Sequence, residues 1–571
     1  MSLMRRGARF LASLGVASLL LACEGPHASG STPVASASGP VELVLIHTAD
    51  LHSHVFPQPT LITSADARRG LGTEGEVEAV GGLARLASLV RRERNAAAHS
   101  LYLDSGDLVV GTAAFTAFHG EPEMRALSEL GVAAAALGNH DLDLGAAAFA
   151  EARNRFETFP VLAANYRASH GALLGEFAPY AIVSANGLKV GVIGVANPAS
   201  PSGLGDSKNE LGITLLDTAS AVQAAIDTLC TKVDVIVAIT HLGLGLDESL
   251  IAHTSGLDVV LGGHEHLTLD AALTRSDCGV DVRAKLGCAP RHVVLVHSGA
   301  LSRYVGRVAL TLSPAASPSN GWEVTNAVHT LLPVAAAVPE DPSVHALLEP
   351  YRARLTAEGL DRPLAFALGP VERYAANGGD SALGDLVTDA LRQATGAPLA
   401  ILNTTGIRAD LPPGPLTQSE LIAALPFDDP LTVLEIRGAD LLATLEQQQA
   451  RAAAQCQSAM QLSGLSVEFA CTGASPCSGL GCSPNGRVRA LIAGAPIDPG
   501  ESYLMVTTVF IAEGNTGFDA LRNASARRDL ELEPVDALLR AVTTRSNCPQ
   551  SELPCLDPST FRDGRIRLRA R

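Results

Sequence analysis

The sequence predicts an α/β fold, because apolar strand-like runs and segments with helical spacing alternate along most of the chain. Val41–His47 and Val233–Thr240 are β-branched, aliphatic runs typical of buried strands, and Gly81–Glu93 has the periodicity of an amphipathic helix. A second observation is that Asp, Asn and His residues stand directly after several of these strands. In α/β sheets, ligands bind at the carboxyl ends of the strands, so these positions predict a functional site.

The length and charge of the chain limit its architecture and its partners. A chain of 571 residues is too long for one hydrophobic core, so we expect two or three domains. Its composition, 47% apolar and 18% charged, is that of a globular protein. The formal net charge of −17 argues against nucleic acid as a partner, because such a surface needs a basic footprint. Phosphate substrates stay possible, since bound metal ions reverse the local field.

The N-terminus is expected to lie outside the fold. A basic start is followed by an apolar run, Phe10–Ala22, which is too short to span a bilayer comfortably as a helix. Leu20-Leu21-Ala22-Cys23 resembles a bacterial lipobox, which implies cleavage before Cys23 and lipidation of its thiol. The alternative is ordinary signal-peptidase cleavage nearby. We therefore expect a lipoprotein signal peptide over residues 1–23 and a flexible Ser/Gly/Pro-rich tether over 24–40.

This N-terminus predicts an exported protein, lipid-anchored in the bacterial cell envelope at the periplasm or outer membrane, or periplasmic or secreted without the lipid. Ten cysteines fit such an oxidising compartment. A zinc site is the alternative in the CTGASPCSGLGC run, but Gly/Ser-rich loops of exported proteins favour disulfides. Cys230, on an apolar helical face, is expected to be a buried free thiol. The candidates for disulfides are Cys278 with Cys288, Cys548 with Cys555, and the cluster Cys456, Cys471, Cys477 and Cys482.

Further elements follow from the same periodicity rules. The predicted strands are Leu101–Leu103, Val132–Leu137, Val161–Asn165, Ala181–Val195, Val259–Gly262, His292–His297 and Tyr304–Leu312. The predicted helices are Pro122–Leu130, 146–156, Thr218–Lys232 and Glu248–Thr254. Asn186-Gly187 inside the long apolar run is typical of a hairpin turn.

Metal-ligating residue types follow five of these strands. Asp50 and His52 are two residues apart, so an extended backbone would point both to the same side, where they suit a divalent transition metal. One such residue is most often structural, as we expect for His99, His119, His170, His292 and His297. Five loops with the same chemistry are much harder to explain in that way. The later loops contribute Asp107, Asn139, His140, Asp143, His241, His264 and His266.

The set Asp50-x-His52, Gly106-Asp107, Gly138-Asn139-His140-Asp141, His241 and Gly263-His264-x-His266 resembles the calcineurin-like metallophosphoesterases. A longer resemblance, over most of residues 41–540, is to the 5'-nucleotidase family. It implies an N-terminal four-layer α/β/β/α metallophosphoesterase domain over 41–332, a connector helix over 333–365 and a second, smaller α/β substrate-binding domain over 366–571.

The resemblance also implies the roles of the site residues. Two divalent metal ions (Zn, Mn or Co) clamp the oxygens of a phosphoryl transfer and activate a water. His140 meets the phosphoryl oxygens and Asp143 orients its ring. The implied ligand set is Asp50, His52 and His266 for one metal, Asn139, His241 and His264 for the other, and Asp107 as a bridge between them. His54 and Asp104 have no implied role.

The second half resembles the family's substrate domain at four places. Asp380–Leu391 resembles its S-x-x-G-[ND]-L helix, Ala400–Arg408 its N-x-G-G-I-R loop with Thr405 in place of a Gly, Leu425–Phe427 its P-F loop, and Val509–Ala512 its second aromatic. The implied substrate-binding residues are Asn403, Arg408, Phe427 and Phe510, with the two aromatic rings stacking a nucleobase.

Two departures concern the substrate domain. Thr516 stands where the family has an Asp that holds the ribose hydroxyls. A second Arg is expected before the S-x-x-G helix, and the nearest candidate, Arg373, lies several residues too early.

The implied function is an exported two-metal phosphohydrolase of nucleotide catabolism. It would release phosphate from nucleoside 5'-monophosphates by attack of a metal-activated water. Alternatives in the same class are a 2',3'-cyclic phosphodiesterase or 3'-nucleotidase, a nucleotide-sugar hydrolase and a phosphatase acting on another organic phosphate. An alternative of another class is a non-catalytic, nucleotide-binding surface lipoprotein. Because metals and aromatics belong to different domains, we expect the domains to close during catalysis. The oligomeric state does not follow from the sequence.

Overall fold

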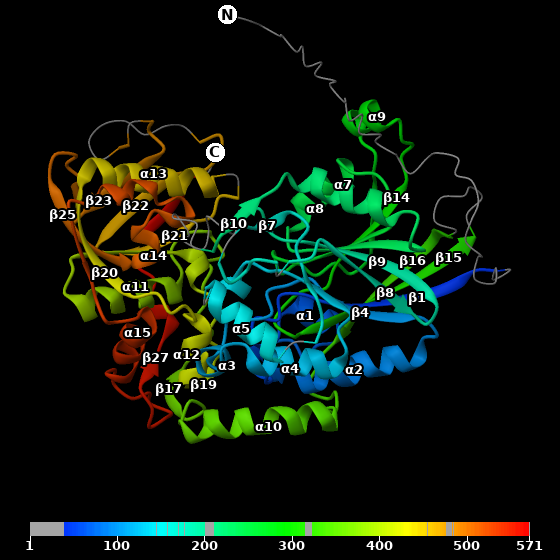
Figure 1. Ribbon diagram of the computed structural model, residues 1–571. Coiled ribbons are helices and arrows are strands. Elements are labelled where there is room, and N and C mark those ends of the chain that lie inside the picture. The colour runs from blue at the N-terminus through cyan, green and yellow to red at the C-terminus, as the bar shows by residue number, and fades with distance from the viewer. Residues whose placement is uncertain are drawn as a thin grey trace, which may run out of the picture.

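The computed structural model describes residues 39–569, apart from 200–210, 315–321, 475–481 and positions 144, 157, 170, 176, 454 and 484. It confirms the predicted α/β class, with an N-terminal and a C-terminal part connected through one long helix, α10 (Figure 1). The expected signal peptide with Cys23 lies outside the described residues. Among the helices described, none combines the length and the apolar character that a membrane span requires.

The N-terminal part is built on two six-stranded sheets that pack against each other. The first has the order β16 (Trp322–Pro333), β15 (Tyr304–Pro314), β1 (Val41–Thr48), β4 (Ser100–Asp104), β5 (Ala134–Ala136), β6 (Val161–Leu162). The second has the order β13 (Leu273–Ser276), β14 (His292–His297), β12 (Val259–Gly262), β11 (Val235–Thr240), β9 (Leu188–Val195), β8 (Tyr180–Ala185). Along β1, Leu43 and Leu45 enter the core between the sheets, while Val44 and Ile46 face the helices outside.

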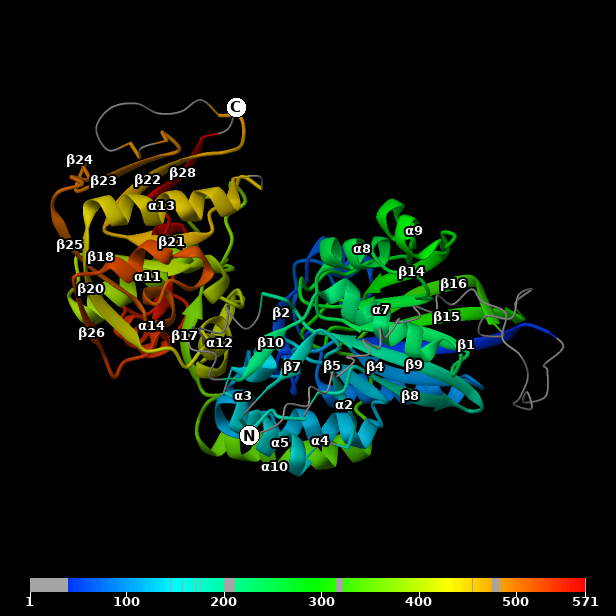
Figure 2. The ribbon, with the colours of Figure 1, turned by 45° about the horizontal axis from the view of Figure 1, so that its top comes forward.

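Helices cover the outer face of each sheet, which gives the predicted four layers. Figure 1 shows α7 and α8 on one side of the two sheets and α4 and α10 on the other, and α8 and α10 again lie on opposite sides in Figure 2. The helices are α2 (Leu83–Ala96), α4 (Glu121–Leu130) and α10 (Pro342–Ala357) beside the first sheet, and α7 (Thr218–Leu229) and α8 (Leu244–Ala252) beside the second. The smaller elements are β2 (Gln58–Leu61), α1 (Ser64–Arg68), β3 (Val77–Val80), α3 (Ala113–Phe118), α5 (Ala146–Phe156), β7 (Tyr166–Ala168), β10 (Ile213–Leu215) and α9 (Val280–Leu286).

The C-terminal part is a smaller α/β unit with its own core. Its central sheet has the order β21 (Met460–Ser463), β18 (Leu399–Asn403), β25 (Ser502–Thr508), β20 (Leu431–Arg437), β26 (Ala526–Asp529). Two further sheets have the orders β19 (Gly414–Thr417), β17 (Pro363–Ala367), β27 (Cys555–Leu556) and β24 (Ala495–Pro496), β23 (Val488–Ile492), β22 (Leu465–Ala470), β28 (Ile566–Arg569). The helices are α11 (Ala382–Thr395), α12 (Gln418–Ala424), α13 (Gly438–Ala452), α14 (Val509–Ala512) and α15 (Pro534–Thr543).

Helix α10 is fixed to the N-terminal part. The Tyr351 hydroxyl donates to Glu121 Oε1 (2.6 Å) and accepts from Arg125 Nη1 (2.9 Å). Just beyond the helix, the N–H and Oγ of Ser419 both donate to the Leu360 carbonyl (3.0 and 2.9 Å), which fixes that residue to the C-terminal part. Between them lies Gly359 at φ +77°. The chain therefore passes from one part to the other within a few residues.

Disulfides form where the cysteine spacing suggested. Cys278–Cys288 and Cys548–Cys555 close the predicted short loops. Within the cluster, Cys456 pairs with Cys471, and Cys477 lies outside the described residues. Cys230 is a buried free thiol, as predicted.

Candidate metal centre

The loops that carry the predicted ligands meet at the carboxyl ends of parallel strands. β1 pairs in parallel with β4, and β4 with β5, while β11 pairs in parallel with β12 in the second sheet. Hydrogen bonds connect the sheets at this edge. Ser105 Oγ donates to the Leu261 carbonyl (2.7 Å), His241 Nδ1 donates to the Ser105 carbonyl (2.8 Å), and the His264 N–H donates to Asp50 Oδ1 (3.0 Å). The site that the sequence predicted therefore lies where the carboxyl ends of the two sheets meet.

The backbone at the site is curled, and the expectation of an extended Asp50–His52 segment is wrong. Five predicted ligands have left-handed backbones: Asp50 (φ 52°), His52 (47°), Asp107 (56°), His264 (80°) and His266 (57°). Such residues each cost roughly 1–3 kcal/mol and persist where the surroundings hold them. Here the Asp50 N–H donates to the Gly106 carbonyl (2.9 Å) and the His52 N–H to the Asp107 carbonyl (3.0 Å). Gly138 packs against the backbone of Asp107 where these two loops meet. A Cβ at this position would lie only 2.0 Å from Asp107 N, so a larger residue does not fit.

Asp50, His52 and His266 form a first group of possible metal ligands. Their nearest ligand atoms all lie within 4.8 Å of one another. His52 Nε2 is 3.0 Å from His266 Nε2, and His266 Nε2 is 3.6 Å from Asp50 Oδ1. These three residues were predicted to share one metal, and the structure brings them together.

A second group surrounds His241. Its Nε2 lies 3.0 Å from Asp107 Oδ2 and 3.2 Å from Asn139 Oδ1, and Asn139 Oδ1 lies 3.0 Å from His264 Nδ1. Asp107 Oδ2 is also 3.5 Å from His52 Nε2, so this carboxylate lies between the two groups. Asp50 Oδ1 is 3.9 Å from His241 Nε2, which places a second carboxylate near both. The sequence indicated only Asp107 in that position.

The chemistry of these residues fits divalent metal ions, which the fold implies. His52 Nδ1 donates to the Val110 carbonyl (2.9 Å), as His241 Nδ1 does to Ser105, so their Nε2 lone pairs face the group. A backbone carbonyl on the far nitrogen is the usual support of a metal-bound imidazole. Two ring nitrogens 3.0 Å apart beside two buried carboxylates form a donor set that a shared cation would bind and neutralise. Imidazole and carboxylate donors suit transition metals.

Burial and neighbouring charges keep most of these histidines in the neutral form that binds metal. Burial lowers the pKa of His52 and of His266 well below the usual range, and Arg408 lowers that of His266 further. Burial and then His241 lower the pKa of His264 to about 4. Asp107 is buried, which opposes its ionisation, but His241 and His140 hold its pKa well below the usual range. Asp107 in turn raises the pKa of His241 to about 10 against the effect of burial.

His140 lies beside the two groups and is oriented by Asp143. Its Nδ1 is 2.8 Å from Asp143 Oδ2, and its ring centroid is 5.4 Å from that of His52. Its backbone N–H donates to Asp107 Oδ1 (2.8 Å). Burial opposes protonation of this ring, but Asp143 and then Asp107 raise its pKa above the ordinary value. A protonated His140 next to the cluster offers its Nε2–H to an anion.

Two buried carboxylates that the sequence left without a role support the ligand loops. Asp141 accepts the N–H groups of Gly138 (2.7 Å) and Leu108 (2.9 Å) and so connects two loops. Asp104 accepts the Gly106 N–H (2.8 Å) and the Thr48 hydroxyl (2.6 Å). Their place within three residues of a predicted ligand was the signal that the sequence offered. His54 is buried with Nδ1 donating to the His52 carbonyl (2.8 Å), and Glu265 turns away to accept the Leu244 N–H (3.0 Å).

The C-terminal part contributes an arginine and an aromatic ring to the same place. Arg408 Nη2 lies 3.4 Å from His52 Nε2. The Phe427 ring centroid is 5.5 Å from that of His140 and 5.9 Å from the Arg408 guanidinium carbon. Arg373 also belongs here, despite its early position in the sequence: its Nη1 donates to the carbonyls of Ile407 (3.3 Å) and Arg408 (2.6 Å). Both parts of the molecule therefore form one site.

The other predicted substrate residues make their contacts within the C-terminal part. Asn403 Nδ2 donates to Thr405 Oγ1 (3.0 Å). The Phe510 N–H donates to Asp429 Oδ1 (3.0 Å), two residues after Phe427, which fixes the two aromatic loops to each other. Thr516 has a left-handed backbone (φ 51°, ψ 31°) and accepts from Gln448 Nε2 at its carbonyl (3.2 Å).

Comparisons with known proteins agree with this architecture. Residues 43–267 match the calcineurin-like phosphoesterase family, and residues 363–523 match the 5'-nucleotidase C-terminal domain. The chain is 26% identical to a 5'-nucleotidase of Bos taurus over 530 residues, which cover 86% of this chain and 87% of the relative. Among solved structures, a 5'-nucleotidase precursor from Thermus thermophilus matches with a TM-score of 0.77 and 28% identity, over 92% of this chain and 99% of that one. A sulfate thiohydrolase, SoxB, from the same organism shares the fold with a TM-score of 0.69 and 20% identity, over 92% of this chain and 98% of that one.

Proposed function

The chain belongs to the 5'-nucleotidase family of metal-dependent phosphoric ester hydrolases, and we propose that its substrates are nucleoside 5'-monophosphates, from which it releases phosphate. One observation carries this proposal. Arg408 and Phe427 of the C-terminal part reach His52 and His140, so an anion-binding group and a base-stacking ring stand beside the metal-ligand cluster. A phosphate ester of an aromatic base needs both groups.

The cluster would hold two divalent ions, of Zn, Mn or Co. Asp50, His52 and His266 would bind one ion, and Asp107 would be shared between the two. The ligands of the other would be Asn139, His241, His264 and the same Asp107. When bound, such ions lower the pKa of a water and neutralise charge on the phosphoryl oxygens. The 3.5 Å and 3.0 Å distances from Asp107 Oδ2 to His52 Nε2 and His241 Nε2 support the shared role.

His140 would stabilise the charge that develops on the phosphoryl group. Asp143 accepts from Nδ1, so Nε2 is the nitrogen free to meet the substrate. The raised pKa of His140 favours the imidazolium, whose Nε2–H donates to a phosphoryl oxygen and later to the leaving oxygen. The Asp107–His140 backbone hydrogen bond fixes this ring relative to the metal ligands.

The C-terminal part would bind the rest of the nucleotide. Arg408 presents a planar guanidinium suited to phosphate oxygens, and Phe427 offers a ring face to the base. Asn403 and Phe510 would complete this pocket. Asp429, which connects the Phe427 loop to the Phe510 backbone, supports a paired action of the two aromatic rings.

A substrate panel tests the proposal. Phosphate release from AMP, UDP-glucose, a 2',3'-cyclic nucleotide and an aryl phosphate is measured for the wild type and for His140→Ala, with metal added or chelated. We expect a strong preference for AMP, loss of activity on chelation, and a fall in kcat of about 100-fold or more in the variant, the usual effect of removing one group that stabilises transition-state charge. Equal turnover of the aryl phosphate would contradict the nucleotide specificity while leaving the hydrolase chemistry in place.

The division into domains and the export of the chain are parts of the same proposal. The domains would span 41–332 and 366–571, with α10 inside the connector 333–365. Helix α10 is attached to the N-terminal part through Tyr351, so we expect limited proteolysis to cut the chain after residue 357, the end of this helix.

Lipidation at Cys23 would anchor the protein in the envelope. Mass spectrometry of the membrane-extracted N-terminal peptide tests this, and an unmodified Cys23, or a mature chain beginning elsewhere, would contradict it.

A further inference from the structure

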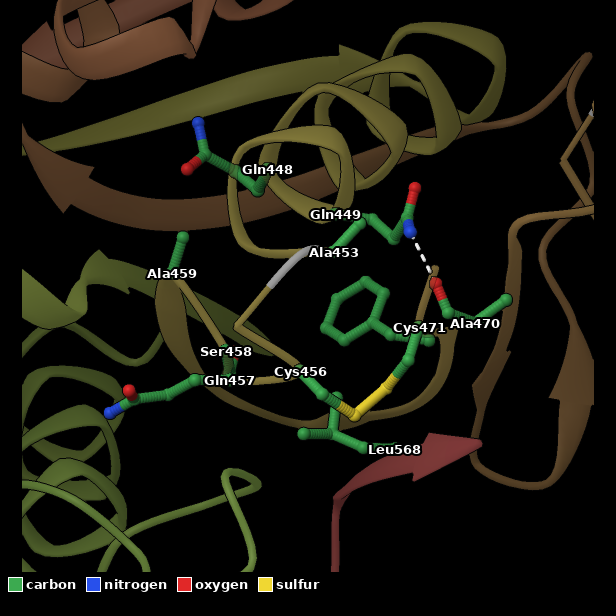
Figure 3. A pocket seen from close by; sticks show the side chains of 11 residues that line it. Gln448, Gln449, Ala453, Cys456, Gln457, Ser458, Ala459, Ala470, Cys471 and Leu568 are labelled. Atoms are coloured by element: carbon green, nitrogen blue, oxygen red, sulfur yellow. Dashed lines mark hydrogen bonds between the residues drawn. A yellow bond between two sulfur atoms is a disulfide. The ribbon is translucent and has the colours of Figure 1, made fainter. Parts of the chain in front are cut away.

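A pocket in the C-terminal part lies beside a disulfide that the catalytic proposal does not use. Its lining includes Cys456, Cys471, Ser458 and Gln448 (Figure 3). Cys456 belongs to the segment Cys456–Ala459, which connects α13 to β21 without helix or strand structure. Cys471 follows β22, and its N–H donates to the Arg569 carbonyl (2.9 Å) at the end of β28. The disulfide therefore attaches an irregular segment to a sheet.

The segment Cys456–Ala459 holds two other loops by hydrogen bonds. The Thr404 N–H donates to the Ala459 carbonyl (2.9 Å), and Thr404 Oγ1 donates to the Ser458 carbonyl (3.1 Å). The Ser458 N–H donates to the Gly378 carbonyl (2.6 Å). Thr404 begins the loop that ends at Arg408, and Gly378 belongs to the loop that begins at Arg373. One segment thus supports both arginine-bearing loops.

The two arginines are also coupled to each other. Arg373 Nη1 donates to the carbonyls of Ile407 and Arg408, and Arg408 Nη2 reaches His52 across the domain boundary. Gln448, from the same pocket wall, donates to the carbonyl of Thr516 in the loop after Phe510. A shift of the Cys456–Ala459 segment would therefore change the substrate side of the site. It would not move the metal ligands, because these all lie in the N-terminal part.

We propose that the Cys456–Cys471 disulfide, acting through the Cys456–Ala459 segment, positions Arg373 and Arg408, so that its loss weakens phosphate-ester binding but not metal binding. The proposal rests on the proposed function in the choice of substrate. Its physical basis is that preorganised donors bind an anion at a lower ordering cost than mobile ones. Cys456 and Cys471 are positioning residues here, because neither touches the metal cluster.

The test compares Cys456→Ser/Cys471→Ser with the wild type in the metal-loaded, full-length protein. The control is Cys278→Ser/Cys288→Ser, which removes a disulfide of similar loop length in the N-terminal part. Thr404→Val is a second variant that keeps both cysteines and deletes two hydrogen bonds of the hydroxyl, the one it donates to the Ser458 carbonyl and the one it accepts from Gln461 Nε2. The readouts are kcat and KM for AMP, the Kd of inorganic phosphate by calorimetry, and the metal content.

For the Cys456/Cys471 variant and for Thr404→Val we expect the KM and the phosphate Kd to rise about tenfold, the factor set by one weakened charge-assisted contact, with kcat and metal content unchanged. The control should retain wild-type values. A KM and Kd within about twofold of wild type in both variants, or a loss of metal in either, would overturn the proposal. If the wild type does not hydrolyse AMP, the proposed function fails, whereas the phosphate Kd still decides the role of the disulfide.

Discussion

His329 should make the N-terminal part unstable in acid, although it takes no part in the proposed reaction. Its side chain on β16 is buried, with only 8% of its surface exposed to solvent. Burial lowers its pKa from 6.5 to about 4, and the Leu269 backbone and the Asp270 carboxylate oppose this only in part. Burial, and then the neighbouring His297 and His329, lower the pKa of His47 in the same region. The folded chain therefore keeps His329 neutral at a pH where the unfolded chain protonates it.

The sign and size follow from this difference. Because the pKa of His329 is lower in the folded chain than in the unfolded chain, its contribution to the free energy of unfolding is fully present above pH 6.5. This contribution is lost as the pH falls towards 4, the pKa in the folded chain. The full effect is roughly 3 kcal/mol, and at about pH 5 it is roughly 2 kcal/mol, since one pKa unit corresponds to about 1.4 kcal/mol. Urea unfolding at about pH 7.5 and about pH 5 measures it in the wild type and in His329→Asn. Trp322, the single tryptophan of the sequence, lies on the same strand and reports the transition by fluorescence.

Both proteins are measured after chelation, so that release of metal in acid does not enter the comparison. The wild type should lose about 2 kcal/mol more than His329→Asn between the two pH values. His292→Asn, which changes an exposed histidine at the start of β14, is the control and should behave as the wild type. Equal losses in the wild type and in His329→Asn would refute the reasoning from burial.

Three further predictions concern the site. Asp141→Ala should weaken divalent metal binding at least about tenfold in a metal titration, because its carboxylate holds the Gly138 and Leu108 backbones that present the ligands; an unchanged affinity would contradict this support. Thr516→Asp should lower the KM for AMP and leave that for an aryl phosphate unchanged, because the family resemblance implies an Asp at this position that holds the ribose hydroxyls; equal shifts for both substrates would argue against a sugar contact. A cross-link that holds Arg408 away from His52 should abolish turnover in a steady-state assay, since the two parts form one site, and full activity of the cross-linked protein would count against domain closure.

Local sequence rules predicted the elements well. The Asn186-Gly187 turn lies between β8 and β9, and both residues have positive φ (48° and 100°), as a tight hairpin turn requires. The strand Val233–Thr240 and the helix Thr218–Lys232 have counterparts in β11 and α7, whose bounds differ by a few residues at their ends. These features depend on neighbours in sequence. The gathering of ligands at one edge followed equally, because it depends only on the direction of parallel strands.

Features that depend on distant contacts were not accessible in this way. Arg373 looked misplaced by its position in the chain, yet its guanidinium donates to the backbone of the Arg408 loop. The choice of Cys471 as the partner of Cys456 depends on how the end of β22 approaches the segment after α13. Asp141 lay inside a recognised motif, but its role follows from a contact with Leu108 in another loop. In each case tertiary packing brings together groups that no spacing rule connects.

The Asp50–His52 pair shows how a correct ligand prediction can rest on an incorrect backbone. Spacing of two residues places side chains on one side of an extended strand, but both residues are left-handed. They converge on the cluster because the Asp50 and His52 N–H groups are held by the carbonyls of Gly106 and Asp107, so the two ligand loops fold over each other. The same bonds fix Asp107 between both histidine groups. The left-handed backbone is therefore the means by which one loop supplies ligands to the first group and its neighbour supplies the carboxylate shared with the second.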